Sequence, residues 1–167
     1  MPLSMYQASV PTCLRFLTAL SAILDKASAH QRESGADEGE MMNARLAPDM
    51  LPLVKQVQIA TDHAKGMAAR LAGREVPKFD DTETTIEELK ARIGKIMEFV
   101  SSVEVGEIDG SETREITLKL RDRTLTLPGQ QYLLHFALPN FFFHVTTAYD
   151  ILRHKGVPLG KADFMGA

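Results

Sequence analysis

The sequence predicts an all-α fold: a four-helix bundle in a single domain, residues 1–167, with a small β-hairpin before the last helix. In four long stretches, apolar residues recur every three or four positions, as on the buried face of a helix. Between the third and fourth stretches the period falls to two, which is typical of paired strands. The expected helices span about residues 5–31, 48–71, 85–104 and 130–155, and the hairpin about 114–127.

Composition limits the class of protein. A chain of 167 residues with 44% hydrophobic and 25% charged residues can bury a real core in one domain. The net charge of -3 and the pI of about 5.9 give no electrostatic reason to expect nucleic acid as a partner. The start of the chain lacks a basic segment and a cleavage site, and we expect no apolar run long enough to span a membrane. The interpretation is a cytoplasmic protein.

The first two helices have recognisable ends. Ser4 followed by Gln7 predicts a capping box at the start of the first helix. The only cysteine, Cys13, excludes an intrachain disulfide and lies on the apolar stripe, where a small core residue is expected rather than a nucleophile. Pro48 suits the first position of the second helix, and Gly73 suits its end.

The segment between the second and third helices is polar. Residues 78–84 carry three carboxylates and are expected to form a solvated loop with no acid–base role. Thr84 or Thr85 is expected to cap the third helix, with Glu87 or Glu88 completing a capping box. The apolar face of the hairpin that follows is expected to lie against the bundle, because two strands alone are only marginally stable.

The fourth helix carries the candidate site. Residues 130–156 form the longest densely apolar segment and hold three of the five histidines. Phe136, Asn140 and His144 are four residues apart and therefore share one face of a helix, whereas His135 would point away from His144. Pro139 either kinks this helix or begins a new one, and the sequence leaves both readings open.

Three consecutive phenylalanines, residues 141–143, cover most of the way around one turn of this helix. They are best interpreted as core residues together with a surface for a second copy of the chain, so that a homodimer is expected. A pocket for a small-molecule ligand is the alternative, because such pockets are mostly apolar with a few polar groups.

Three segments of the chain resemble a known family. They are LSMYQASVPTCLRFL near the start, NARLAPDMLPLVKQVQIATDHAKG in the second helix and LPNFFFHVTTAYDILRHKGV in the fourth. With the order of helices and hairpin, they resemble the DinB/YfiT-like superfamily of four-helix bundles. Within it, the chain is most similar to an uncharacterised bacterial domain family with no settled activity.

The resemblance implies a candidate metal site. Metal-binding members of the superfamily use one histidine from the second helix and two from the fourth, four residues apart. In this chain the matching positions are His63, Asn140 and His144, so an amide stands where one imidazole would be. Zinc or nickel are the divalent ions such a site implies, and an amide oxygen is a poorer ligand for them. Asp49, His135 or water could complete the shell.

Three functions remain open at this point. The first is a small binding protein with a degenerate metal or ligand site at these three residues. The second is a metal-dependent enzyme of the thiol-transferase kind that the superfamily contains, in which the ion would lower the pKa of a bound thiol or water. The third is a dimeric structural module, in which His63 or His144 would hydrogen-bond Asn140 instead of a metal.

Overall fold

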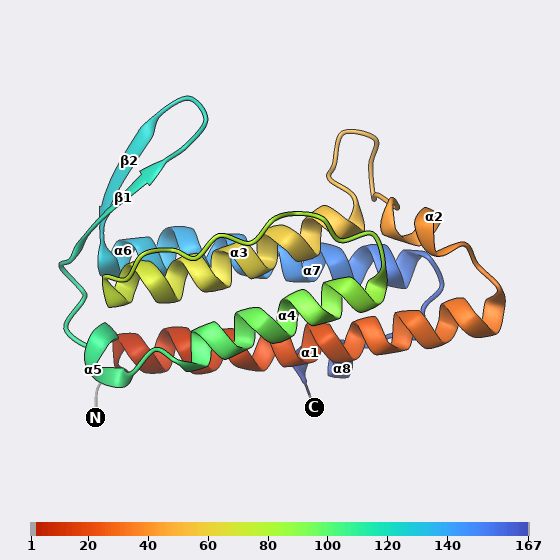
Figure 1. Ribbon diagram of the computed structural model, residues 1–167, viewed down its shortest axis with the longest axis horizontal. Helices are drawn as coiled ribbons and strands as arrows, with labels where there is room; N and C mark the ends of the chain where they lie inside the picture. The colour runs from red at the N-terminus through yellow and green to blue at the C-terminus, as the bar shows by residue number, and fades with distance from the viewer. Residues whose placement is uncertain (1–2, 167) are drawn as a thin grey trace.

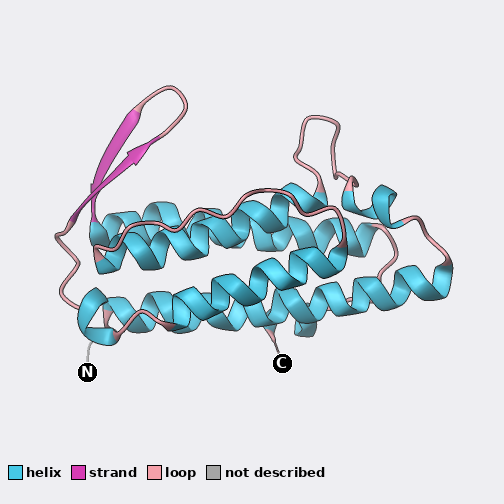
Figure 2. Ribbon diagram, in the orientation of Figure 1, coloured by secondary structure: helices cyan, strands magenta, loops and turns pink. Residues whose placement is uncertain are grey.

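The computed structural model describes residues 3–166 and shows a mainly helical protein with one two-stranded sheet (Figure 2). Four long helices pack around a common core. They are α1 (Met5–Ser34), α3 (Leu53–Ala72), α4 (Ile86–Ser101) and α7 (Leu138–His154). The shorter elements are α2 (Glu38–Met42), α5 (Val105–Ile108), β1 (Glu115–Lys119), β2 (Thr124–Pro128), α6 (Gly129–Tyr132), the π-helical turn η1 (Leu133–Ala137) and α8 (Lys161–Met165).

The helices lie in two layers, one with α3 and α7 and the other with α1 and α4 (Figure 1). α1 and α7 run in one direction along the molecule, and α3 and α4 run in the other (Figure 1). Because α3 and α4 run in the same direction, the linker between them, residues 73–85, has to return along the whole length of α3. The expected order of three long helices, a hairpin and a last long helix is therefore observed.

Apolar stripes build the core as the periodicity predicts. The α1 stripe is fully buried at Cys13, Leu17, Leu20 and Leu24, and burial raises the pKa of the Cys13 thiol far above its usual range. By length and composition alone α1 could cross a membrane, contrary to the expectation from the sequence. Its apolar residues, however, are the ones that pack against the other long helices, and this packing accounts for its composition.

The predicted start of the second helix was wrong, whereas two predicted caps are confirmed. Ser4 caps α1 in a capping box with Gln7, and Thr85 caps α4 in a box with Glu88. α3 begins at Leu53, with Pro52 as its N-cap, and not at Pro48. The physical reason is Pro52 itself, which disfavours helical geometry in the residue before it and so prevents a helix from running through from Pro48.

The hairpin pairs β1 with β2 in antiparallel register, with Ile116 opposite Leu127 and Leu118 opposite Leu125. Ile116 and Leu118 are buried and belong to the core cluster, as expected for the apolar face of the hairpin. The rest of the hairpin stands away from the end of the helices (Figure 1). Residues 118–120 of the hairpin segment lie beside Arg70 near the end of α3, close to the candidate site.

The fourth long segment is one continuous helical path with a π-helical turn inside it. α6, η1 and α7 follow one another without a break, and the backbone N–H of Leu138 donates to the carbonyl of Leu133, five residues back. Pro139 stands in the first turn of α7, where its missing N–H costs least. The sequence left open whether Pro139 kinks this helix or begins a new one. In the structure the helix continues through this region, and its type changes from π to α just before the proline.

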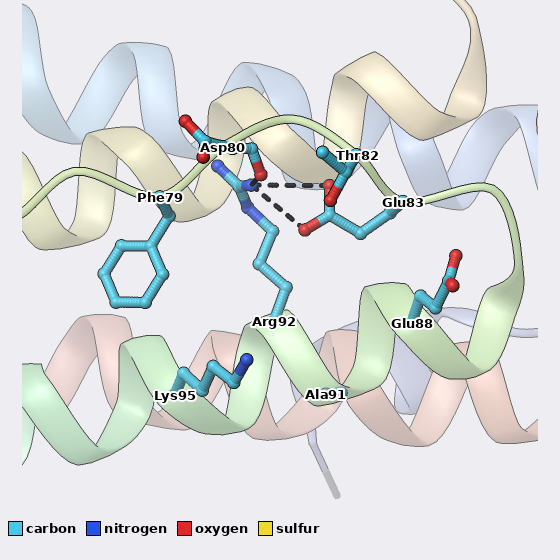
Figure 3. A pocket seen from close by; sticks show the side chains of 8 residues that line it. All are labelled: Phe79, Asp80, Thr82, Glu83, Glu88, Ala91, Arg92 and Lys95. Carbon is cyan, nitrogen blue, oxygen red and sulfur yellow. Dashed lines mark hydrogen bonds and ion pairs between the residues drawn. The ribbon is translucent and has the colours of Figure 1, made fainter.

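The linker between α3 and α4 is not simply a solvated loop, which corrects the expectation for its carboxylates. The buried Arg92 of α4 reaches Glu83 of the linker at 3.1 Å (Figure 3). It also reaches Asp81 of the linker at 3.1 Å and Asp62 of α3 at 3.0 Å. Its Nε also donates to the hydroxyl of Thr61 at 2.8 Å. A buried guanidinium must be paired, and the linker supplies two of its partners. These carboxylates fasten the linker across α3 and α4.

Arg92→Met should therefore destabilise the protein by about 2–4 kcal/mol, because it leaves three carboxylates near one another without their shared cation. Lys95→Met is the matched control, since Lys95 is an exposed cation one turn further along α4. Its effect should stay within about 0.5 kcal/mol. Urea unfolding followed by circular dichroism gives both values, and equal stabilities for the two variants would contradict the structural role of Arg92.

Candidate functional site

The fold brings His63 of α3 and His144 of α7 side by side. Their rings are nearly parallel, with an interplanar angle of 13° and centroids 5.8 Å apart. Phe136 of η1 lies next to them, with its ring centroid 5.9 Å from that of His63. Two imidazoles from distant parts of the sequence therefore face the same small region between the two helices.

Gln56 determines the orientation and the tautomer of His144. Gln56 is 1% exposed, and its Nε2 donates to the carbonyl of Leu51 at 2.9 Å, which leaves Oε1 as an acceptor. That oxygen lies 2.7 Å from Nδ1 of His144, so Nδ1 carries the proton and donates it. The other ring nitrogen, Nε2, consequently keeps its lone pair, which is the form of imidazole that binds a metal or accepts a proton.

Both imidazoles are held in the neutral state. Burial lowers the pKa of His63 to about 4, with smaller contributions from repulsion by His144 and Arg70, and Asp62 opposes the shift. Burial also lowers the pKa of His144. At neutral pH the site therefore presents two uncharged rings with available lone pairs.

Asn140, the third residue that the resemblance implied, is turned towards its own helix. Its Nδ2 donates to the carbonyl of Phe136, four residues back, at 2.7 Å. The amide thus makes no hydrogen bond to either histidine, and Gln56 takes the role that Asn140 would have had in a purely structural pair. Only Oδ1 of Asn140 remains uncommitted among its two polar atoms.

The other residues considered for the shell lie elsewhere. His135 is exposed, as its spacing from His144 predicted, and Asp49 is exposed in the loop before α3. Within residues 3–166, no group of three or more His, Cys, Asp or Glu side chains lies close enough together to hold a metal ion. The protein groups present therefore amount to two imidazoles and one amide oxygen.

A cavity of about 200 Å³ opens beside His63. Besides His63 it is lined by Phe136, Asp62, Arg70 and three residues of the hairpin segment, Leu118, Lys119 and Leu120. His63 is thus reached from the side where the hairpin lies beside the end of α3. A small molecule that entered there would contact apolar side chains, one imidazole, the guanidinium of Arg70, and the charged groups of Lys119 and Asp62. Asp62 is paired with Arg92 and Lys65.

Sequence reasoning missed Gln56 and Arg70. Each lies seven residues from His63 on α3, and seven residues are close to two helical turns, so all three follow one line along the helix. Polar residues at this spacing beside an apolar stripe were the signal that could have found them.

The fold of this chain is similar to that of a solved protein. A crystal structure described as a DinB family member protein from Shewanella denitrificans is 38% identical in sequence and superposes with a TM-score of 0.87. The match covers 97% of this chain and 92% of the other.

Residues 5–165 match the family described as Domain of unknown function (DUF1993), and the chain belongs to this family. No match was found among the curated proteins. The resemblance inferred from the three sequence segments is confirmed.

The low pKa of His63 predicts a pH-dependent stability. The unfolded chain takes up a proton at His63 near pH 6.5 and the folded protein only near pH 4, so acid favours unfolding in that window. The contribution should be complete above about pH 7 and should fall by roughly 2–3 kcal/mol as the pH drops towards 4. His63→Gln should flatten this slope, leaving the smaller part due to His144. Urea unfolding between pH 4 and 7.5 measures both, and parallel slopes for the two proteins would contradict a buried neutral His63.

Proposed function

We propose that this protein binds a divalent transition-metal ion, such as zinc or nickel, or a small ligand in the same place, through His63 and His144. The observation that carries the proposal is the pair of neutral, nearly parallel imidazoles, one of them oriented by a buried amide. Orientation of a histidine through its second ring nitrogen is the usual arrangement around metal-ligating imidazoles. The proposal is a binding function, and no reaction is assigned to the site.

The spacing of the two rings is compatible with one shared ion. At a zinc–nitrogen distance of about 2.1 Å and a tetrahedral angle, two imidazole centroids stand roughly 5 Å apart. The observed 5.8 Å is close to this value, but the rings stack nearly parallel, so the His63 ring would have to turn until its lone pair met that of His144 at one ion. The His63 side chain has no hydrogen bond to another of the residues 3–166 that would oppose this turn. His144 would keep its bond to Gln56 during this movement.

Asn140 would be a weak third ligand. Since its amide nitrogen donates to Phe136, the oxygen is the atom left for an ion. An amide oxygen suits zinc and nickel less well than imidazole does, so the affinity should be modest. Water or a group of a bound small molecule would occupy the remaining position, as in sites that keep one position open.

Metal binding can be measured on protein purified without an affinity tag. Isothermal titration with Zn²⁺ and Ni²⁺ should show one site in the wild type and none in His63→Ala or His144→Ala. Asn140→His should raise the affinity at least about tenfold, because an imidazole four residues before His144 points to the same side of α7.

His135→Ala is the matched control, since it removes an exposed imidazole from the same helical segment, and it should bind as the wild type does. Absence of stoichiometric binding in both the wild type and Asn140→His would overturn the metal proposal. Loss of binding in the His135 variant would place the ion elsewhere.

A further inference from the structure

Arg70 lines the cavity beside His63 and has no partner of opposite charge among residues 3–166. Its Nη1 donates to the hydroxyl of Tyr132 at 3.3 Å, and burial raises the pKa of that phenol, so the partner is neutral. Within residues 3–166 no carboxylate lies within 4.0 Å of the Arg70 guanidinium. Asp62, an acidic residue that also lines the cavity, is already ion-paired with Arg92 and Lys65. Arg70 therefore remains available to an anion.

The position of this guanidinium is built into α3. Arg70 folds back along its own helix and lies over Gly66, one turn earlier. If Gly66 carried a side chain, the three nearest heavy atoms to its Cβ would all belong to the Arg70 guanidinium, and the closest would overlap with it. A glycine in the middle of a helix costs about 1 kcal/mol relative to alanine, and here it makes room for the arginine beside the cavity.

We infer that the cavity beside His63 binds a small organic carboxylate, with the carboxylate on Arg70 and the carbon skeleton against Phe136, Leu118 and Leu120. The cavity volume of about 200 Å³ suits a molecule of a few carbon atoms. A guanidinium matches a carboxylate with two parallel hydrogen bonds, which gives both strength and orientation. Lys119, exposed at the same rim, adds a second positive charge.

This inference deepens the proposed function, because it names the class of small molecule that would reach the same imidazole. The two can nevertheless fail separately. Arg70 takes no part in holding a metal ion, and the histidines take no part in pairing with the carboxylate. Removal of the arginine charge should weaken carboxylate binding and should not lower any metal affinity, because Arg70 repels positive charge at His63.

The test uses hexanoate and benzoate as probes, with hexanol and benzyl alcohol as neutral counterparts. They are titrated into metal-free protein while the amide and methyl resonances of the chain are followed by nuclear magnetic resonance. The carboxylates should shift resonances of Leu118 and Leu120 saturably in the millimolar range, and the alcohols should bind at least tenfold more weakly. Failure of both carboxylates to saturate these shifts, or equal affinity for acids and alcohols, would overturn the inference.

Three variants complete the experiment. Arg70→Gln should weaken carboxylate binding about tenfold or more, the loss expected for a hydrogen-bonded charge. Gly66→Ala keeps the charge and favours the helix but displaces the guanidinium, so it should fold at least as well and still bind carboxylates more weakly. Arg153→Gln removes an exposed arginine near the end of α7 and should bind as the wild type does. Wild-type affinity in both Arg70→Gln and Gly66→Ala would contradict the role given to Arg70.

Discussion

The antiparallel packing of α3 against α7 is the contact on which the site depends. It places His63 opposite His144 and brings Gln56 to the second nitrogen of His144. The α3 stripe that belongs to the core contains small residues, among them Ala60 and Ala64, both fully buried. Small side chains let helices approach closely, so the polar residues beside them can reach across to the facing helix. The same packing that excludes water from the core thus keeps both imidazoles neutral.

α3 presents different chemistry on its different sides. The line of Gln56, His63 and Arg70 faces α7, η1 and the hairpin, whereas Thr61 and Asp62 bond to Arg92 of α4. Adjacent residues of a helix point in different directions, so Asp62 can pair with Arg92 while His63 stacks on His144, although both also line the cavity beside the hairpin. The charged side of α3 holds the returning linker in place, and the other side is left free to form the candidate site.

The sequence predicted what depends on periodicity and on local signals. The core stripes, the caps at Ser4 and Thr85 and the alternating strands all follow from neighbours in the chain, and the structure confirms them. It could not predict features decided by distant partners. The carboxylates of the linker looked solvated because Arg92, which pairs with them, is revealed only by the fold. Likewise, the family pattern points to Asn140, but its amide is taken by a carbonyl of its own helix, and Gln56 serves His144 instead.

The π-helical turn at η1 changes the rotational phase of the last long helix. In a regular α-helix, Tyr132 and His144 would be about 120° apart around the axis, on different sides. A wider turn advances fewer degrees per residue, so five residues of it bring the segment before Pro139 round towards the side that His144 occupies. Phe136, within this turn, contacts the rings of both Tyr132 and His63. Such a turn accommodates one extra residue in a helix while the segments on both sides keep their packing. Deleting a residue there would rotate one segment about the helix axis relative to the other, so that one of them would lose its buried contacts.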